Sequence, residues 1–138
     1  MQKHTSKESL TRAIAIGIDT QSRDQISCKE SLVELSELGK TAGLTIIDII
    51  SQQRRTPART TYIGKGKLLE IKAYIDANCI ACVLTDDELT PSQSKEMEKS
   101  LNVKIIDRTG LILEIFAQRA QTYEAKLQVE LAQLTYLL

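Results

Sequence analysis

The stretch AIAIGI at residues 13–18 sets the class of the fold. It is almost continuously apolar, and three further runs of this kind follow it: LTIIDII at 44–50, IACVL at 80–84 and VKII at 103–106. Strands with continuous rather than alternating hydrophobicity are typical of parallel sheets that helices cover on both faces. The spacing between the centres of successive predicted strands is close to the roughly 30 residues of a βαβ unit. The sequence therefore predicts an α/β fold: a small four-stranded parallel sheet flanked by helices.

A helix is predicted in each gap between these strands. Ser27–Glu30 and Thr90–Gln93 both match the capping box, in which the first and fourth side chains satisfy free backbone N–H groups of the first turn. Apolar residues at helical spacing indicate a third helix over 67–77. Gly39 and Gly43 supply stop signals for the first of the three helices, since glycine commonly ends helices.

Residues 110–138 contain no proline and no glycine after Gly110, so they predict one long C-terminal helix. Its apolar stripe repeats every eleven residues, which favours straight or slightly right-handed helix pairing. Leaving this stripe in water is unfavourable, so we expect two copies to pair as a homodimer or the helix to fold back. The helix-pairing residues are Phe116, Tyr123, Leu127, Leu131 and Leu134.

Length and composition limit the organisation of the chain. It has 138 residues, and its 18 Lys+Arg balance its 18 Asp+Glu, which excludes binding of nucleic acid by overall charge. We expect a flexible N-terminal tail at 1–11, the α/β domain at 12–109 and the long helix at 110–138. No segment has the apolar run of a secretion signal or the ~20 apolar residues of a membrane span. A soluble, cytoplasmic protein without membrane contact is predicted.

Charge is nevertheless concentrated locally. Residues 52–72 carry six Lys and Arg against Glu70, and six minus one gives +5. Because this segment follows the second strand, it lies at the edge of the sheet where α/β proteins bind ligands. The segment fits contact with RNA phosphates, although a solvated charged loop would have the same composition. The RNA-binding hypothesis names Arg54, Arg55, Arg59, Lys65 and Lys67 as phosphate contacts, Tyr62 as a base stacker, and Gly64 and Gly66 as a phosphate loop.

An alternative is a nucleotide- or Mg²⁺-binding domain with its own phosphoryl chemistry. Asp19, Asp86 and Asp107 each follow a predicted strand and could approach one another. However, the P-loop pattern G-x-x-x-x-G-K-[ST] is missing, and no catalytic constellation replaces it. Cys79 and Cys82 lack the second pair of ligands that a zinc site needs. We therefore predict that this chain is not an enzyme and has no catalytic residue, metal site or cofactor of its own.

Four strings of residues, in this order, carry a family resemblance. They are YIGKGK at 62–67, DDELTPSQ at 86–93, VKIIDRTGLILEIFAQRA at 103–120 and EAKLQVELAQL at 124–134. Together they resemble the N-terminal domain of the HflX family of ribosome-associated GTPases, over roughly residues 12–138. The last two strings are long and specific, whereas GKGK alone is not.

The resemblance implies more than the residues show. It implies an α/β domain followed by a two-helix hairpin, of which 110–138 is the first arm, and then a GTPase domain with the P-loop. GTP and Mg²⁺ are expected for the full-length parent and not for this fragment. The implied partners are the large ribosomal subunit with its rRNA and the parent's own GTPase domain. The implied role is association with ribosomes that the parent can split or rescue.

Overall fold

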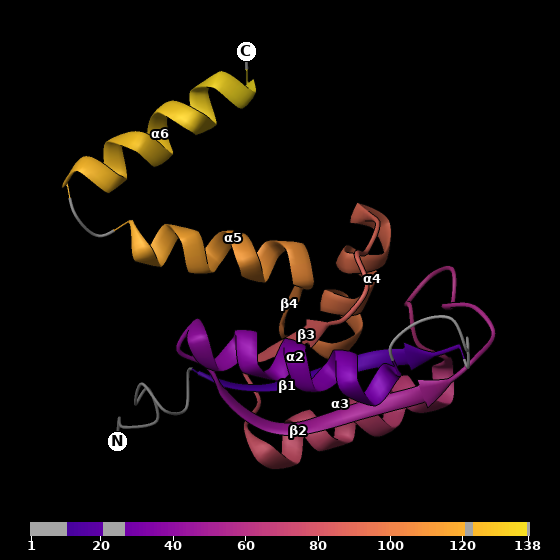
Figure 1. The fold of residues 1–138 in the computed structure, drawn as a ribbon. Helices are drawn as coiled ribbons and strands as arrows, with labels where there is room; N and C mark the ends of the chain where they lie inside the picture. Colours follow the sequence, from indigo (N-terminus) through magenta and orange to yellow (C-terminus); the bar gives the residue numbers. More distant parts are fainter. Residues whose placement is uncertain (1–10, 21–26, 121–122, 138) are drawn as a thin grey trace.

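The computed structural model describes residues 11–20, 27–120 and 123–137. Four strands form one parallel sheet in the order β2-β1-β3-β4 (Figure 1). Their bounds are β1 Arg12–Asp19, β2 Thr45–Gln53, β3 Cys82–Thr85 and β4 Lys104–Asp107. The predicted parallel α/β sheet is confirmed. The tail predicted at 1–11 lies outside the described residues, apart from Thr11.

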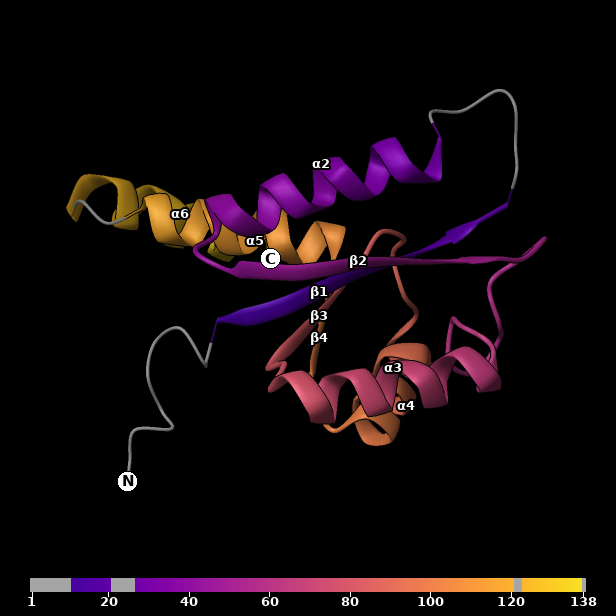
Figure 2. The same cartoon turned by 90° about the horizontal axis from the view of Figure 1, so that it is seen from below.

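Helices cover both faces of this sheet. Helices α2 (Cys28–Thr41) and α5 (Arg108–Arg119) lie on one face, while α3 (Lys65–Asn78) and α4 (Pro91–Leu101) lie on the other (Figure 2). Successive strand residues point to opposite faces, so β1 supplies side chains to both layers of the core. On the α2/α5 face the core contains Ala13, Ala15, Leu32, Leu35, Leu84, Leu111 and Ile115. On the α3/α4 face it contains Ile14, Ile16, Ile71, Ile75, Val83, Met97, Leu101 and Ile105.

The capping box predicted at Thr90–Gln93 is confirmed, and at Ser27 the structure shows the N-cap hydrogen bond of the predicted box. The Ser27 hydroxyl accepts a hydrogen bond from the Glu30 backbone N–H at 3.1 Å. Thr90 and Gln93 form the complete box, with the Gln93 N–H donating to the Thr90 hydroxyl and the Thr90 N–H donating to the Gln93 side chain. These caps place the first turns of α2 and α4 just beyond the loops at the carboxyl ends of the strands.

Of the two glycines predicted as stop signals for α2, Gly43 lies just beyond its end, whereas Gly39 has a different role. It is buried inside α2, which continues to Thr41, and the turn with positive φ falls at Gly43 (φ 94°). A Cβ at Gly39 would lie 2.8 Å from Ile46 Cδ1 and 2.9 Å from Leu84 Cδ1. A side chain here would force these two terminal methyl groups to shift, so glycine at this position lets the helix pack directly on the sheet.

The helix predicted over 110–138 is interrupted, which corrects the expectation of one continuous element. Helix α5 ends at Arg119, with Ala120 at ψ 49°, and α6 spans Tyr123–Leu137. No proline or glycine causes the break. Tertiary contacts hold the end of α5 instead: Ala120 is buried, and the Gln118 amide donates to the Ala42 carbonyl at the end of α2. The eleven-residue stripe therefore does not run along a single helix.

Candidate nucleic-acid interface

The basic segment forms the connection between β2 and α3 at the carboxyl edge of the sheet (Figure 1). We call residues 54–67 the basic loop, although Lys65 to Lys67 already belong to the first turn of α3. Arg55, Arg59 and Lys65 are exposed, while Arg54 and Lys67 are partly exposed. None of these five cations forms a salt bridge with a carboxylate in the described part of the chain. Their charge is available to a ligand.

The two glycines of the GKGK string lie at the start of α3. Gly64 is the N-cap and donates its N–H to the Gln52 side chain at 2.8 Å. A Cβ at Gly64 would come within 2.9 Å of an Arg54 guanidinium nitrogen, so glycine lets this cation approach the helix start. A Cβ at Gly66 would meet open space. The predicted phosphate-loop residues thus lie with Arg54 at a helix N-terminus, where the helix dipole favours anions.

Tyr62 does not have the predicted role. Its side chain is only 1% exposed and belongs to the α3/α4 core, so its ring cannot stack on an RNA base. Its backbone adopts φ 66°, in the left-handed region that residues other than glycine rarely occupy. The ring belongs to the same apolar cluster as Ile63 and Leu68. The charged residues around Tyr62 in the sequence suggested exposure instead. The sequence signal for this burial is the pair Tyr62-Ile63, two large adjacent side chains with apolar groups within the basic segment.

The hydroxyl of Tyr62 donates to Asp87 Oδ2 at 2.6 Å. Burial, followed by this hydrogen bond and the Asp87 charge, raises the pKa of Tyr62 well above its ordinary value. The hydroxyl therefore stays protonated and remains a donor at physiological pH. Asp87 was not among the predicted site residues, and its pairing with Tyr62 connects β2–α3 and β3–α4 loops that are far apart in sequence.

The strand-end carboxylates bind groups of the protein itself. Asp86 Oδ1 accepts from the Arg108 guanidinium at 2.7 Å, beside the point where the chain order of the sheet reverses between β1 and β3. Asp107 caps α5 through the Gly110 N–H and also accepts from the Leu89 N–H. Among the residues that the structure describes, no group of three His, Cys, Asp or Glu side chains could hold a metal ion.

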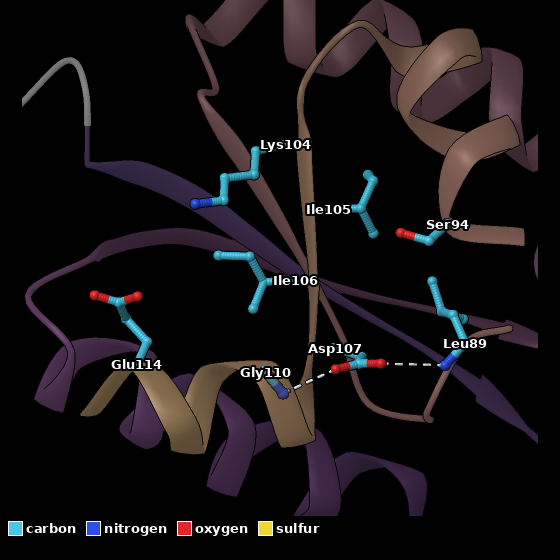
Figure 3. Close-up of a pocket in the computed structure, with 8 residues that line it drawn as sticks. All are labelled: Leu89, Ser94, Lys104, Ile105, Ile106, Asp107, Gly110 and Glu114. Atoms are coloured by element: carbon cyan, nitrogen blue, oxygen red, sulfur yellow. Dashed lines mark hydrogen bonds between the residues drawn. The ribbon is translucent and has the colours of Figure 1, made fainter. Parts of the chain in front are cut away.

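A shallow groove of about 270 Å³ follows the free edge of β4. Figure 3 shows both oxygens of Asp107 engaged at its floor, with Gly110 on one side and Leu89 on the other. Its lining contains one lysine, Lys104, and two acids, Asp107 and Glu114, and it includes no residue of the basic loop. The groove therefore offers no concentration of positive charge.

The predicted helix-pairing side chains are mostly in solvent. Phe116 on α5 is 60% exposed, and Leu127, Leu131 and Leu134 on α6 are also exposed. Tyr123 begins α6, but its side chain lies outside the described residues. The described residues thus leave an apolar surface on α5 and α6 exposed.

Comparison with known proteins decides the family. Residues 29–117 match the family described as "GTP-binding GTPase N-terminal", which is more than half of the chain. The chain belongs to this family. Within it, the GTPase HflX of Flavobacterium psychrophilum is 48% identical over 127 residues, covering 92% of this chain and 31% of that protein. The GTPase HflX of Escherichia coli is 43% identical over 118 residues, covering 86% of this chain and 27% of that protein.

Solved structures agree with this HflX-type domain. A GTP-binding protein from the archaeon Sulfolobus solfataricus in complex with GDP superposes with a TM-score of 0.62 at 26% identity, covering 91% of this chain and 36% of that one. The HflX-type domain thus spans less than a third of the length of its two bacterial relatives. Within its described residues, no helix is both long enough and apolar enough to cross a membrane.

Proposed function

We propose that this chain is the N-terminal, rRNA-binding module of an HflX-type GTP-binding protein and that it contacts the large ribosomal subunit through the basic loop. The observation that carries the proposal is the set of five cations in this loop without carboxylate partners among the described residues. Since RNA phosphates attract such clusters irrespective of net charge, the neutral total of the chain does not oppose it. Arg54 beside Gly64 adds a helix N-terminus to this surface.

The activity proposed for the full-length protein rests on its relatives. Proteins that share this domain are named GTPase HflX, and an archaeal structural neighbour was crystallised with GDP. We propose that the parent binds GTP with Mg²⁺, hydrolyses GTP in its own GTPase domain, and acts in the cytoplasm on ribosomes that it splits or rescues. GTP hydrolysis would then take place in the GTPase domain of the parent, and the present chain would bind that domain.

The exposed apolar surface of α5 and α6 supports a second proposed contact. Burying Phe116, Leu127, Leu131 and Leu134 would remove apolar area from water, which homodimerisation or packing against the next helix of the parent could achieve. For the 138-residue chain we propose the homodimer. A mass in solution equal to that of one chain, 15.4 kDa, at every protein concentration tested would remove this proposal.

Cosedimentation of the chain with purified large ribosomal subunits tests the RNA contact. Charge reversal of Arg54, Arg55 and Arg59 to Glu is expected to abolish binding at moderate salt. For the wild type, the logarithm of the affinity should fall linearly with the logarithm of salt concentration, by about 0.7–0.9 per phosphate contact. Unaltered binding by the triple variant would exclude the basic loop.

A matched control separates the loop from total charge. Reversal of Lys29, Lys95 and Lys99, which are exposed on α2 and α4, changes the net charge by the same amount. We expect this control to retain binding with the salt dependence of the wild type. Equal loss in both triple variants would indicate a response to net charge and would refute a localised site.

A further inference from the structure

The conformation of the basic loop depends on one buried side chain. Ala58 and Tyr62 exchange two backbone hydrogen bonds, of 2.8 and 3.0 Å, and so close the turn whose tip contains Arg59. The closing residue, Tyr62, is held at φ 66°, which is unfavourable for any residue with a Cβ. Backbone in this region persists only when the surrounding contacts over-determine it.

Those contacts come from the neighbouring connection between β3 and α4. The buried Tyr62 hydroxyl donates to Asp87 at 2.6 Å. At the other closing residue of the turn, the NH₂ group of the Gln93 side chain donates to the Ala58 carbonyl at 3.0 Å. The oxygen of the same side-chain amide accepts from the Thr90 N–H and so completes the cap of α4. The turn is thus fastened at both of its closing residues to one adjacent segment.

We propose that Tyr62 and Asp87 are positioning residues for RNA binding: their hydrogen bond holds the Ala58–Tyr62 turn so that Arg59 is presented to phosphate. This inference rests on the proposed RNA-binding function and assigns to Tyr62 a role different from base stacking. Neither residue contacts RNA, since Tyr62 is buried and Asp87 is acidic. Their effect on binding passes through the order of the loop.

Asp87 allows positioning to be distinguished from electrostatics. Removal of an acid beside a cationic surface should strengthen RNA binding if only charge matters. If Asp87 positions the loop, Asp87→Ala weakens binding, whereas Asp87→Asn retains it because the amide oxygen still accepts from Tyr62. Tyr62→Phe, which keeps the ring and loses the donor, should weaken binding as Asp87→Ala does.

The experiment measures binding of each variant to purified large ribosomal subunits across a salt series. For Tyr62→Phe and Asp87→Ala we expect the salt slope to fall by about one phosphate contact, ~0.7–0.9. In an Arg59→Glu background the same changes should have no further effect, because the contact that they position is already lost. Tyr74→Phe is the matched control and should bind as the wild type does, because it removes a tyrosine hydroxyl that lies outside the basic loop, on α3 beside Asp48 of β2.

Hydrogen exchange of the loop amides makes the test independent of ribosome binding. Tyr62→Phe is expected to speed exchange at the backbone N–H of position 62 about tenfold or more, while amides of β1 keep their protection. Unchanged exchange, or tighter binding by Asp87→Ala, would overturn the positioning role even if the wild type binds subunits. If Tyr62→Phe speeds exchange of the loop amides but the wild type does not bind subunits, the proposed RNA-binding function is refuted, while the role of Tyr62 in holding the loop stands.

Discussion

Replacement of Arg108 by Met should destabilise the domain more than any substitution at an exposed ion pair. The Arg108 guanidinium binds Asp86 Oδ1 through two nitrogens, at 2.7 and 3.2 Å, and donates to the Ser31 carbonyl at 2.9 Å. It therefore ties α5 to the end of β3 and to α2. Methionine preserves most of the unbranched stem while it removes the charge and every donor.

The size of the loss follows from burial. The Arg108 and Asp86 side chains are only 26% and 12% exposed, so water replaces the lost contacts poorly. A hydrogen bond to a charged group contributes about 1.5–3 kcal/mol, and complete burial of the abandoned partner would cost about 3–5 kcal/mol. Glu34, at 3.7 Å and 63% exposed, adds little. We expect Arg108→Met to lower the free energy of unfolding by about 2–3 kcal/mol.

Urea denaturation followed by circular dichroism measures this change. With an m-value of about 2 kcal/mol/M, the midpoint should fall by about 1–1.5 M. Asp86→Ala and the double variant complete a cycle whose coupling energy should be about 1–3 kcal/mol. Lys40→Met, which breaks the exposed pair with Glu37, is the control and should cost less than about 0.5 kcal/mol. The reasoning fails if Arg108→Met is no more costly than this control.

Two further predictions concern packing and pH. Gly39→Ala should destabilise the domain by about 1 kcal/mol, because its Cβ would lie 2.8 Å from Ile46 and the overlap outweighs the gain in helix propensity. Gly66→Ala, where a Cβ meets open space, is the control and should be neutral or stabilising. Thermal unfolding measures both changes. Burial raises the pKa of Cys82 to about 11 in the folded protein. As the pH rises, the thiol of the unfolded chain therefore loses its proton first, which favours the unfolded state. The free energy of unfolding should fall between about pH 9 and pH 11, by at most roughly 3 kcal/mol. Denaturation at several pH values under reducing conditions should show this loss in the wild type and in the control Cys79→Ala, because the Cys79 thiol is exposed. Cys82→Ala should show a flatter dependence of stability on pH. An equal slope in Cys82→Ala would contradict the assignment of the loss to Cys82.

Local patterns were sufficient wherever neighbouring residues determine the structure. The β1 and β3 runs became buried strands, and the Thr90–Gln93 string became the cap of α4. The basic loop could also be located, since a segment after a parallel strand must emerge at the carboxyl edge of the sheet. The arginines within it are exposed or partly exposed, as a phosphate-binding surface requires.

The direction of the Tyr62 side chain could not be read from the sequence. Its hydrogen-bond partner, Asp87, is 25 residues away and belongs to another connection. The end of α5 at Arg119 also involves a distant segment, because the Gln118 side chain donates to Ala42, the residue that caps the end of α2. In both cases the local sequence was compatible with two structures, and contacts with a distant segment selected one.

The sequence by itself determined the strand and helix types, the parallel sheet and the position of the charge, because hydrophobic periodicity, capping and chain connectivity act over a few residues. Tertiary structure alone decided which side chains face the core and which face solvent within the loops. It placed Tyr62 inside, left the basic loop without carboxylate partners among the described residues and divided the C-terminal helix into α5 and α6. These outcomes depend on burial and hydrogen bonding between segments that only folding brings together.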